Sequence, residues 1–323
     1  MDDIIDPSAR RIVEAARNAK TISEATLTPA EARENFRRSR RALSPEPPAV
    51  AFVDDFKAPG VAGEIPLRLY RGAGTDVDSD LPVLLFFHSG GWVSGDLDTH
   101  DVVCRSIASV ARCAVIAVDY RLAPEHRFPA AIEDGWSALE FVVKQGASLK
   151  LDTTRIAVGG DSAGGNIAAT LALLARDAAG PRLSLQVLAY PATDFSVEYP
   201  SWAVLADQPP LTRDRLRWFQ KQYLRDDKDR LDWRVSPLLA PDLKGIAPAF
   251  VATAGFDPLH DEGQAYLKRL LAAGVSVRSR RFGGQIHGFI TMGKVVPEAT
   301  ILIGEIAAAL DWAFQATADR SSP

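Results

Sequence analysis

The stretch Val158-Gly159-Gly160-Asp161-Ser162-Ala163-Gly164-Gly165-Asn166 decides the fold of this chain of 323 residues. It follows the β-branched run 156–158 and precedes the helix-compatible run 167–174. Gly-x-Ser-x-Gly in that context is typical of a sharp strand-to-helix turn that exposes a serine in strained backbone. The glycines let neighbouring segments approach closely, and the amino terminus of the helix adds partial positive charge. We therefore expect a nucleophile at Ser162; an ordinary turn or a phosphate-binding loop is the alternative.

Short apolar runs bounded by Gly, Pro or Asp alternate with helical stretches along the rest of the chain. The strand candidates are Val50 to Phe56, Ile65 to Tyr70, Val83 to Phe87, Ala114 to Val118, Ile156 to Val158, Leu185 to Leu188, Phe250 to Thr253 and Val275 to Phe282. The middle runs are apolar at successive positions, as in strands covered on both faces, whereas the last interleaves polar residues like an edge strand. The helix candidate with Ile132, Trp136, Leu139 and Val143 has all four on one face. The pattern predicts an α/β fold, with a mostly parallel eight-stranded sheet flanked by helices.

Two regions do not fit this alternation and predict a helical cap. In residues 1–45, Thr28, Pro29 and Glu31 form a capping box that should start a helix near Pro29. In residues 191–238, Thr212 can cap a helix that carries Leu216, Phe219 and Tyr223 along one side. The tract 44–48, Ser-Pro-Glu-Pro-Pro, reads as a linker. Residues 46–190 and 239–323 are then the two parts of one catalytic domain.

The composition excludes several classes of protein. Hydrophobic residues make up 47% and charged residues 24%, which fits a chain that buries a sizeable core. A net charge of -4 offers no basic surface for a nucleic acid.

The start Met1-Asp2-Asp3 is acidic where a secretory signal is basic, and no long apolar run follows it, so we expect a cytoplasmic protein without stable membrane insertion. Cys104 and Cys113 are expected to be buried thiols, a disulfide being the alternative.

No structural zinc site is expected, because the 5 histidines and 2 cysteines show no metal-ligand spacing, and nothing else in the sequence implies a cofactor.

A serine hydroxyl needs a general base, and His287 is the best candidate. It lies in a Gly-rich loop just after the last strand candidate, and a Ser, then acid, then His order is typical of this kind of elbow. Asp257 follows the run 250–254 and should orient the imidazole from the carboxyl end of a strand. His260 reads as a surface or helix-start residue, and Asp261 and Glu262 as charges at the start of the next helix.

An acyl-transfer site also needs donors for an oxyanion. The loop Phe87-His88-Ser89-Gly90-Gly91-Trp92 follows the third strand candidate, and the N–H groups of Gly90 and Gly91, with that of Ala163, could supply three. An ordinary tight turn is the alternative. His88 is read as a hydrogen-bonding brace for the loop rather than as a second base.

Together these residues resemble the bacterial members of the hormone-sensitive lipase family, also called family IV esterases, in the branch whose elbow reads Gly-Asp-Ser-Ala-Gly-Gly. The resemblance runs from about residue 80 to 290. Besides the elbow, it rests on the segments 119–126 (Asp-Tyr-Arg-Leu-Ala-Pro-Glu-His), 128–131 (Phe-Pro-Ala-Ala), 257–263 (Asp-Pro-Leu-His-Asp-Glu-Gly) and 287–289 (His-Gly-Phe). One departure is Ser89, which stands where the family usually has the first glycine of His-Gly-Gly-Gly. We expect it to alter the stiffness of the loop more than the chemistry, with a strain cost should it need a positive φ.

The resemblance implies an α/β-hydrolase fold, hydrolysis of short- to medium-chain acyl esters by Ser162, His287 and Asp257, a helical cap, no cofactor and often a homodimer. Six residues could line an apolar substrate pocket or pack within the cap: Trp92, Phe195, Trp202, Leu205, Trp218 and Phe219. Two other functions stay open. One is a small-molecule receptor on the same fold, and the other is hydrolysis of, or elimination from, a substrate that is not an ester.

Overall fold

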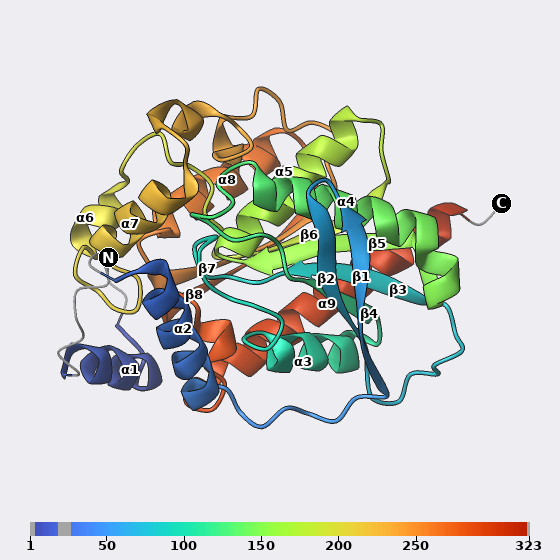
Figure 1. Ribbon diagram of the computed structural model, residues 1–323, viewed down its shortest axis with the longest axis horizontal. Coiled ribbons are helices and arrows are strands. Elements are labelled where there is room, and N and C mark those ends of the chain that lie inside the picture. Colours follow the sequence, from blue (N-terminus) through green and yellow to red (C-terminus); the bar gives the residue numbers. More distant parts are fainter. Residues whose placement is uncertain (1–3, 19–26, 322–323) are drawn as a thin grey trace.

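The computed structural model describes residues 4–18 and 27–321, and the acidic start Met1-Asp2-Asp3 lies outside these ranges. Its centre is one eight-stranded sheet in the order β1-β2-β4-β3-β5-β6-β7-β8 (Figure 1). The strands are β1 (Phe52–Gly60), β2 (Gly63–Arg71), β3 (Leu81–Phe87), β4 (Ala114–Val118), β5 (Leu151–Asp161), β6 (Leu183–Ala189), β7 (Ala249–Phe256) and β8 (Val277–Ile286). Only β2 runs antiparallel to both of its neighbours, so the predicted mostly parallel sheet is confirmed.

Every predicted strand lies within or overlaps an observed one. The fifth is much longer than the run 156–158, because Gly159 and Gly160 pair with Val187 and Leu188 of β6 before the turn begins. The last strand is confirmed as an edge, since β8 pairs with β7 alone and its residues 278–281 are exposed.

Helices cover both faces of the sheet (Figure 1). On one face lie α3 (Asp101–Ala111) and α9 (Glu298–Ser321); on the other lie α4 (Ala130–Gln145), α5 (Ala163–Asp177) and α8 (His260–Ala272). By length and composition α9 could cross a membrane, but Leu302, Ile306 and Leu310 are fully buried in the core beneath the sheet. Cys104 and Cys113 are buried free thiols, as predicted.

The predicted apolar face of α4 is partly wrong. Ile132 and Leu139 are buried, but Val143 is 39% exposed and Val142 takes its place in the core. Ala138 and Val142 are both fully buried beside Leu139, so the buried stripe is shifted by one position at the end of the helix.

The remaining helices gather on one side of the sheet (Figure 1). They are α1 (Pro7–Asn18), α2 (Pro29–Leu43), α6 (Pro200–Val204) and α7 (Arg213–Tyr223), and short 3₁₀ turns span Gly146–Leu149, Asp227–Leu231, Pro237–Leu239 and Phe289–Thr291. The predicted capping box is present at the start of α2: Glu31 N–H donates to Thr28 Oγ1, and Thr28 N–H donates to the Glu31 carboxylate. Thr212 caps α7 by accepting the N–H of Arg215 at 3.1 Å.

Candidate active site

The carboxyl ends of the parallel strands bring the candidate residues to one edge of the sheet. Ser162 follows β5, Asp257 follows β7 and His287 follows β8, while the loop 88–95 follows β3. These segments are up to 199 positions apart in sequence, from 88 to 287, so only the sheet places them side by side.

Ser162 occupies the strained turn predicted for it, with φ 55° and ψ −117° between β5 and α5. Such a φ is rare for a residue with a side chain and is held by its surroundings. The flanking glycines explain how the turn fits: a Cβ on Gly160 would lie 2.4 Å, and one on Gly164 1.9 Å, from the carbonyl oxygen of Phe87. Any side chain at these two positions would push β3 away from the turn.

His287 lies between the serine and the aspartate. Its Nε2 is 2.8 Å from Ser162 Oγ, and its Nδ1 is 2.7 Å from Asp257 Oδ2. Because a carboxylate only accepts, Nδ1 carries the proton and Nε2 is left to accept the serine hydroxyl. Asp257 is fully buried, and its other oxygen accepts the N–H of Leu259 at 2.9 Å. The arrangement can remove a proton from Ser162 and stabilise the imidazolium that forms.

Gly90 and Gly91 border the cavity beside Ser162, and both have positive φ, of 122° and 61°. A Cβ on Gly90 would lie 2.1 Å from the carbonyl oxygen of Ser94, so this turn requires glycine there. Ala163 follows Ser162 directly as the first residue of α5 and is fully buried. Ser89 is not among the described residues with positive φ, so the strain considered for it does not arise.

A buried polar network behind the site was missed from the sequence. Nε2 of His100 lies 3.1 Å from Ser89 Oγ and 3.1 Å from Oδ1 of Asp161, the residue before Ser162. Burial works to raise the pKa of Asp161, but His100 and the hydrogen bonds from His100 and Ser89 hold that pKa below its ordinary value. The Ser89 hydroxyl, which the usual family glycine lacks, therefore connects the loop 88–95 through His100 to the turn at Ser162.

His88 fits the bracing role predicted for it. Its Nδ1 donates to the Ser89 carbonyl at 2.8 Å, its ring stacks on Tyr120 at 4.3 Å, and the Tyr120 hydroxyl donates to the His88 carbonyl. Burial lowers the pKa of His88 to about 4, so the ring stays neutral near pH 7. His260 begins α8, as expected, and its Nδ1 donates to the Ala254 carbonyl.

Three of the six predicted pocket residues border the cavity over Ser162: Trp92, Phe195 and Phe219. Trp92 stacks on Tyr223 at 4.4 Å and meets Phe195 edge-on at 5.4 Å. The enclosed part of the cavity is small, about 50 Å³, so the lining side chains lie close to Ser162.

Trp202, Leu205 and Trp218 do not border this cavity, so they fit the alternative that the sequence left open, packing inside the protein without lining the pocket. All three are buried elsewhere. The Trp202 indole donates to the buried Glu262 of α8 at 3.3 Å. Trp218 packs edge-on against Phe219, at a centroid distance of 5.3 Å, so it supports a pocket residue from behind.

Glu262 has a larger part than the helix-start charge we predicted. It is fully buried, and its Oε1 accepts the N–H groups of Thr193 and Asp194 while Oε2 accepts the Trp202 indole. Asp261 accepts the N–H of Ser201 at 2.9 Å. The two acids therefore tie α8 to the segment that follows β6.

Other residues on the cavity wall were not predicted from the sequence. They are Phe36 and Arg40 from α2, Pro210 and Leu211 before α7, Arg215 and Leu216 in α7, and Ala192, Leu259 and Gly288. A usable signal was present: Phe36 and Arg40, like Arg215 and Phe219, are four positions apart and so share one face of a helix.

The fold and the site define a class, the α/β hydrolases. A family model described as the alpha/beta hydrolase fold matches residues 84–291. Among curated proteins, the carboxylic ester hydrolase LipN of Mycobacterium tuberculosis is 46% identical over 273 residues, which cover 82% of this chain and 72% of LipN. The ethyl acetate hydrolase of Pseudomonas putida is 40% identical over an alignment that covers 90% of this chain and 92% of that enzyme.

Solved structures agree with this result. An α/β hydrolase from the metagenome of Lake Arreo superposes with a TM-score of 0.93 at 39% identity, over 97% of this chain and 99% of that one. The hyperthermophilic esterase of Pyrobaculum calidifontis superposes with a TM-score of 0.90 at 36% identity, over 97% of this chain and 99% of that one. The chain belongs to the α/β-hydrolase carboxylesterase family, as the sequence motifs implied.

Proposed function

We propose that this protein hydrolyses short- to medium-chain carboxylic esters with Ser162, His287 and Asp257 as its catalytic residues. The observation that carries the proposal is the unbroken hydrogen-bonded line from Ser162 Oγ through His287 to Asp257, at 2.8 and 2.7 Å. The names of the relatives, which include carboxylesterases and an ethyl acetate hydrolase, support the ester as the substrate class.

In this mechanism His287 takes the proton of Ser162 as the oxygen attacks the ester carbonyl, and a tetrahedral oxyanion forms. The N–H groups of Gly90, Gly91 and Ala163 are proposed to hold that charge, each donor contributing roughly 2.7–4 kcal/mol to the transition state. His287 then protonates the departing alcohol. Water attacks the acyl-enzyme by the same route, while Asp257 keeps the imidazole in one tautomer.

Residues 1–45 and 191–238 are proposed to form a helical cap over this site. In support, α2 and α7 both contribute to the cavity wall. They also attach to the rest of the molecule by polar contacts: the Arg33 guanidinium donates to the Val93 and Ala123 carbonyls, and the Arg127 guanidinium donates to the Lys221 carbonyl. A cap held in this way excludes water from the ester and limits its size.

A series of p-nitrophenyl esters from acetate to palmitate tests the proposal. Wild type should turn over the short and medium esters faster than palmitate, and Ser162→Ala should reduce turnover to the background rate. Full activity in the alanine variant would refute Ser162 as the nucleophile. Hydrolysis of an amide or lactone panel, with no ester turned over, would show that the site serves another reaction.

The receptor alternative predicts binding without turnover. A fluorophosphonate that labels wild type and fails to label Ser162→Ala would exclude it, because labelling needs an activated serine. A homodimer and a cytoplasmic location remain predictions, which light scattering and cell fractionation test.

A further inference from the structure

The two helices on the cavity wall repeat one pairing of side chains. In α2 the guanidinium of Arg40 lies over the ring of Phe36, 4.6 Å from its centroid. In α7 the guanidinium of Arg215 lies over the ring of Phe219 at 5.3 Å. All four residues border the cavity over Ser162. Two segments about 175 positions apart in sequence thus each bring one permanent positive charge to the same small space.

Arg40 is fixed next to the catalytic histidine loop. Its side chain is buried, with 8% exposed, and it donates to Thr291 Oγ1. A Cβ placed on Gly288, the residue after His287, would lie 3.8 and 3.9 Å from the two terminal nitrogens of Arg40. The Arg40 guanidinium therefore packs against Gly288, the residue next to the histidine whose imidazole protonates the leaving alcohol.

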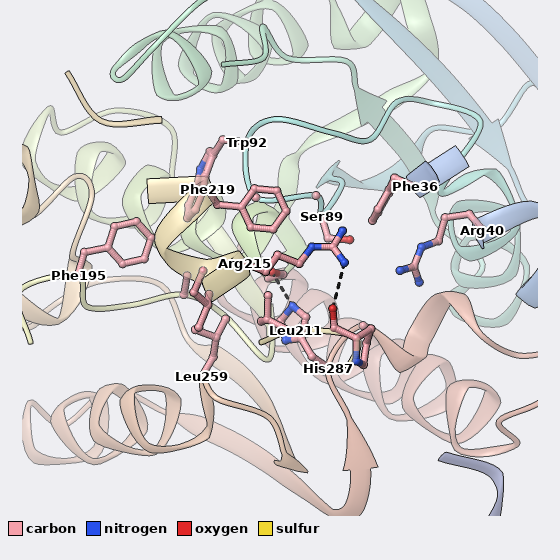
Figure 2. A pocket seen from close by; sticks show the side chains of 17 residues that line it. Phe36, Arg40, Ser89, Trp92, Phe195, Leu211, Arg215, Phe219, Leu259 and His287 are labelled. Carbon is pink, nitrogen blue, oxygen red and sulfur yellow. Dashed lines mark hydrogen bonds between the residues drawn. The ribbon is translucent and has the colours of Figure 1, made fainter. Parts of the chain in front are cut away.

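The two ends of the cavity differ in character. Figure 2 shows Phe195 and Leu259 on one side of Ser89 and His287, Phe36 and Arg40 on the other, and the Arg215 guanidinium between them. The first end is apolar and suits an acyl chain. The second end carries the Arg40 guanidinium, and that of Arg215 faces it from the middle of the cavity (Figure 2). Because His287 must reach the leaving oxygen, the alcohol part of an ester belongs on the side of the histidine loop.

We infer that Arg40 and Arg215 form an anion subsite for the alcohol part of the substrate, so that esters of hydroxy acids, with an ionised carboxylate beyond the scissile oxygen, are preferred. This inference rests on the proposed esterase function. A guanidinium has five N–H donors in a planar fork, so each arginine can keep several contacts to the protein and still donate to a carboxylate. The Pro210 carbonyl, which accepts from Arg215 at 3.0 Å, holds that fork over the cavity.

A matched pair of substrates isolates the charge. Butyryloxyacetate and butyryloxyacetamide have the same acyl chain and nearly the same shape, but only the first carries a carboxylate. Release of butyric acid is followed by pH-stat titration, and the readout is the ratio of kcat/KM for the carboxylate to that for the amide. Wild type should favour the carboxylate about tenfold or more, the range expected for charge-assisted hydrogen bonds in a partly desolvated site.

Three variants assign the preference to the two arginines. Arg40→Gln and Arg215→Gln should each lower the ratio by about threefold, and the double variant should bring it to one or below. Arg41→Gln is the matched control, because it removes the same charge from the next, exposed position of α2 and should leave the ratio unchanged. Arg215 is only half-buried, so its variant carries the test should Arg40→Gln fail to fold.

Turnover of p-nitrophenyl butyrate separates this inference from the proposed function. If wild type hydrolyses that neutral ester but shows no preference for the carboxylate, the subsite is refuted and the esterase function stands. The subsite is also refuted if Arg40→Gln and Arg215→Gln both keep the wild-type preference for the carboxylate, as Arg41→Gln should. Failure to hydrolyse any ester refutes the function, and the subsite with it.

Discussion

Ser89 Oγ lies 3.1 Å from Nε2 of His100, and the same nitrogen lies 3.1 Å from the carboxylate of Asp161. The residue that stands in place of a family glycine thus joins the loop 88–95 to the strand end that carries Ser162. All three side chains are almost fully buried, so the contact is shielded from water. In a buried setting a hydrogen bond is costly to lose, since the partner left behind keeps its desolvation penalty.

Ser89→Gly, which restores the family pattern, should therefore destabilise this protein. It removes a hydrogen bond with a net value of about 0.5–1.5 kcal/mol and adds about 0.5–1 kcal/mol of backbone entropy cost. Urea unfolding should show a lower free energy of unfolding than in wild type, with Ser89→Ala in between. A glycine variant as stable as wild type would contradict the bracing role of the hydroxyl.

The oxyanion loop gives a second prediction. Gly90→Ala should lower kcat by about 10²–10³, because the new Cβ would meet the Ser94 carbonyl at 2.1 Å and displace the N–H groups proposed to hold the oxyanion. Gly91→Ala should cost less, since its Cβ meets the ring of Phe219, a side chain that can shift. Burst and steady-state kinetics on p-nitrophenyl butyrate measure both.

Gly274→Ala is the control for these two substitutions. Its φ is 76°, and its Cβ would have nothing within 4 Å, so it introduces backbone strain without a clash and far from the site. It should reduce stability by about 1 kcal/mol and leave kcat near the wild-type value. A similar loss of kcat in all three variants would mean that strain, and not the donor positions, explains the effect.

The hydrogen-bonded trio of Ser162, His287 and Asp257 was predictable from the sequence because each member lies near a strong local signal. Gly160 and Gly164 mark the turn at Ser162, and Asp257 and His287 each lie a few residues beyond a strand candidate. Parallel pairing then brings these strand ends to one edge, which is a general property of such sheets. No long-range contact had to be known in advance.

The cavity wall could not be predicted in the same way. Trp202 and Phe195 are both large apolar residues in one segment. Trp202 donates a hydrogen bond to Glu262, whereas Phe195 packs edge-on against Trp92 at the cavity. That choice depends on where a buried carboxylate lies, 60 positions further along the chain than Trp202. Arg40 likewise reaches the site only because α2 packs against the loop at Thr291.

Asp257→Asn should leave the fold intact and abolish most of the activity. An amide cannot accept the Nδ1–H of His287 and the N–H of Leu259 with the same two oxygens, so the imidazole loses its tautomer and its electrostatic support. We expect kcat to fall by about 10⁴ with little change in KM. Asp261→Asn, four positions on, should keep most of the wild-type kcat; an equal loss there would point to disruption of the turn.

The last prediction concerns pH and Glu262. Burial raises the pKa of this carboxyl to about 8 from its ordinary 4.5, against the three N–H donors that lower it. The folded protein therefore keeps a proton that the unfolded chain has lost between these two values. The stability that this carboxyl contributes is full below about pH 4.5 and is lost as the pH rises through 8, by up to about 1.4 kcal/mol per pH unit.

Glu262→Gln cannot ionise, so the free energy of unfolding of wild type minus that of the variant should decrease steadily as the pH rises across this window. Urea unfolding at several pH values measures the difference. Glu140→Gln, an exposed position that pairs only loosely with Lys144 at 3.9 Å, should give a flat difference over the same range. Parallel curves for wild type and Glu262→Gln would show that Glu262 stays ionised in the folded protein, held by the N–H groups of Thr193, Asp194 and Trp202 that point at it.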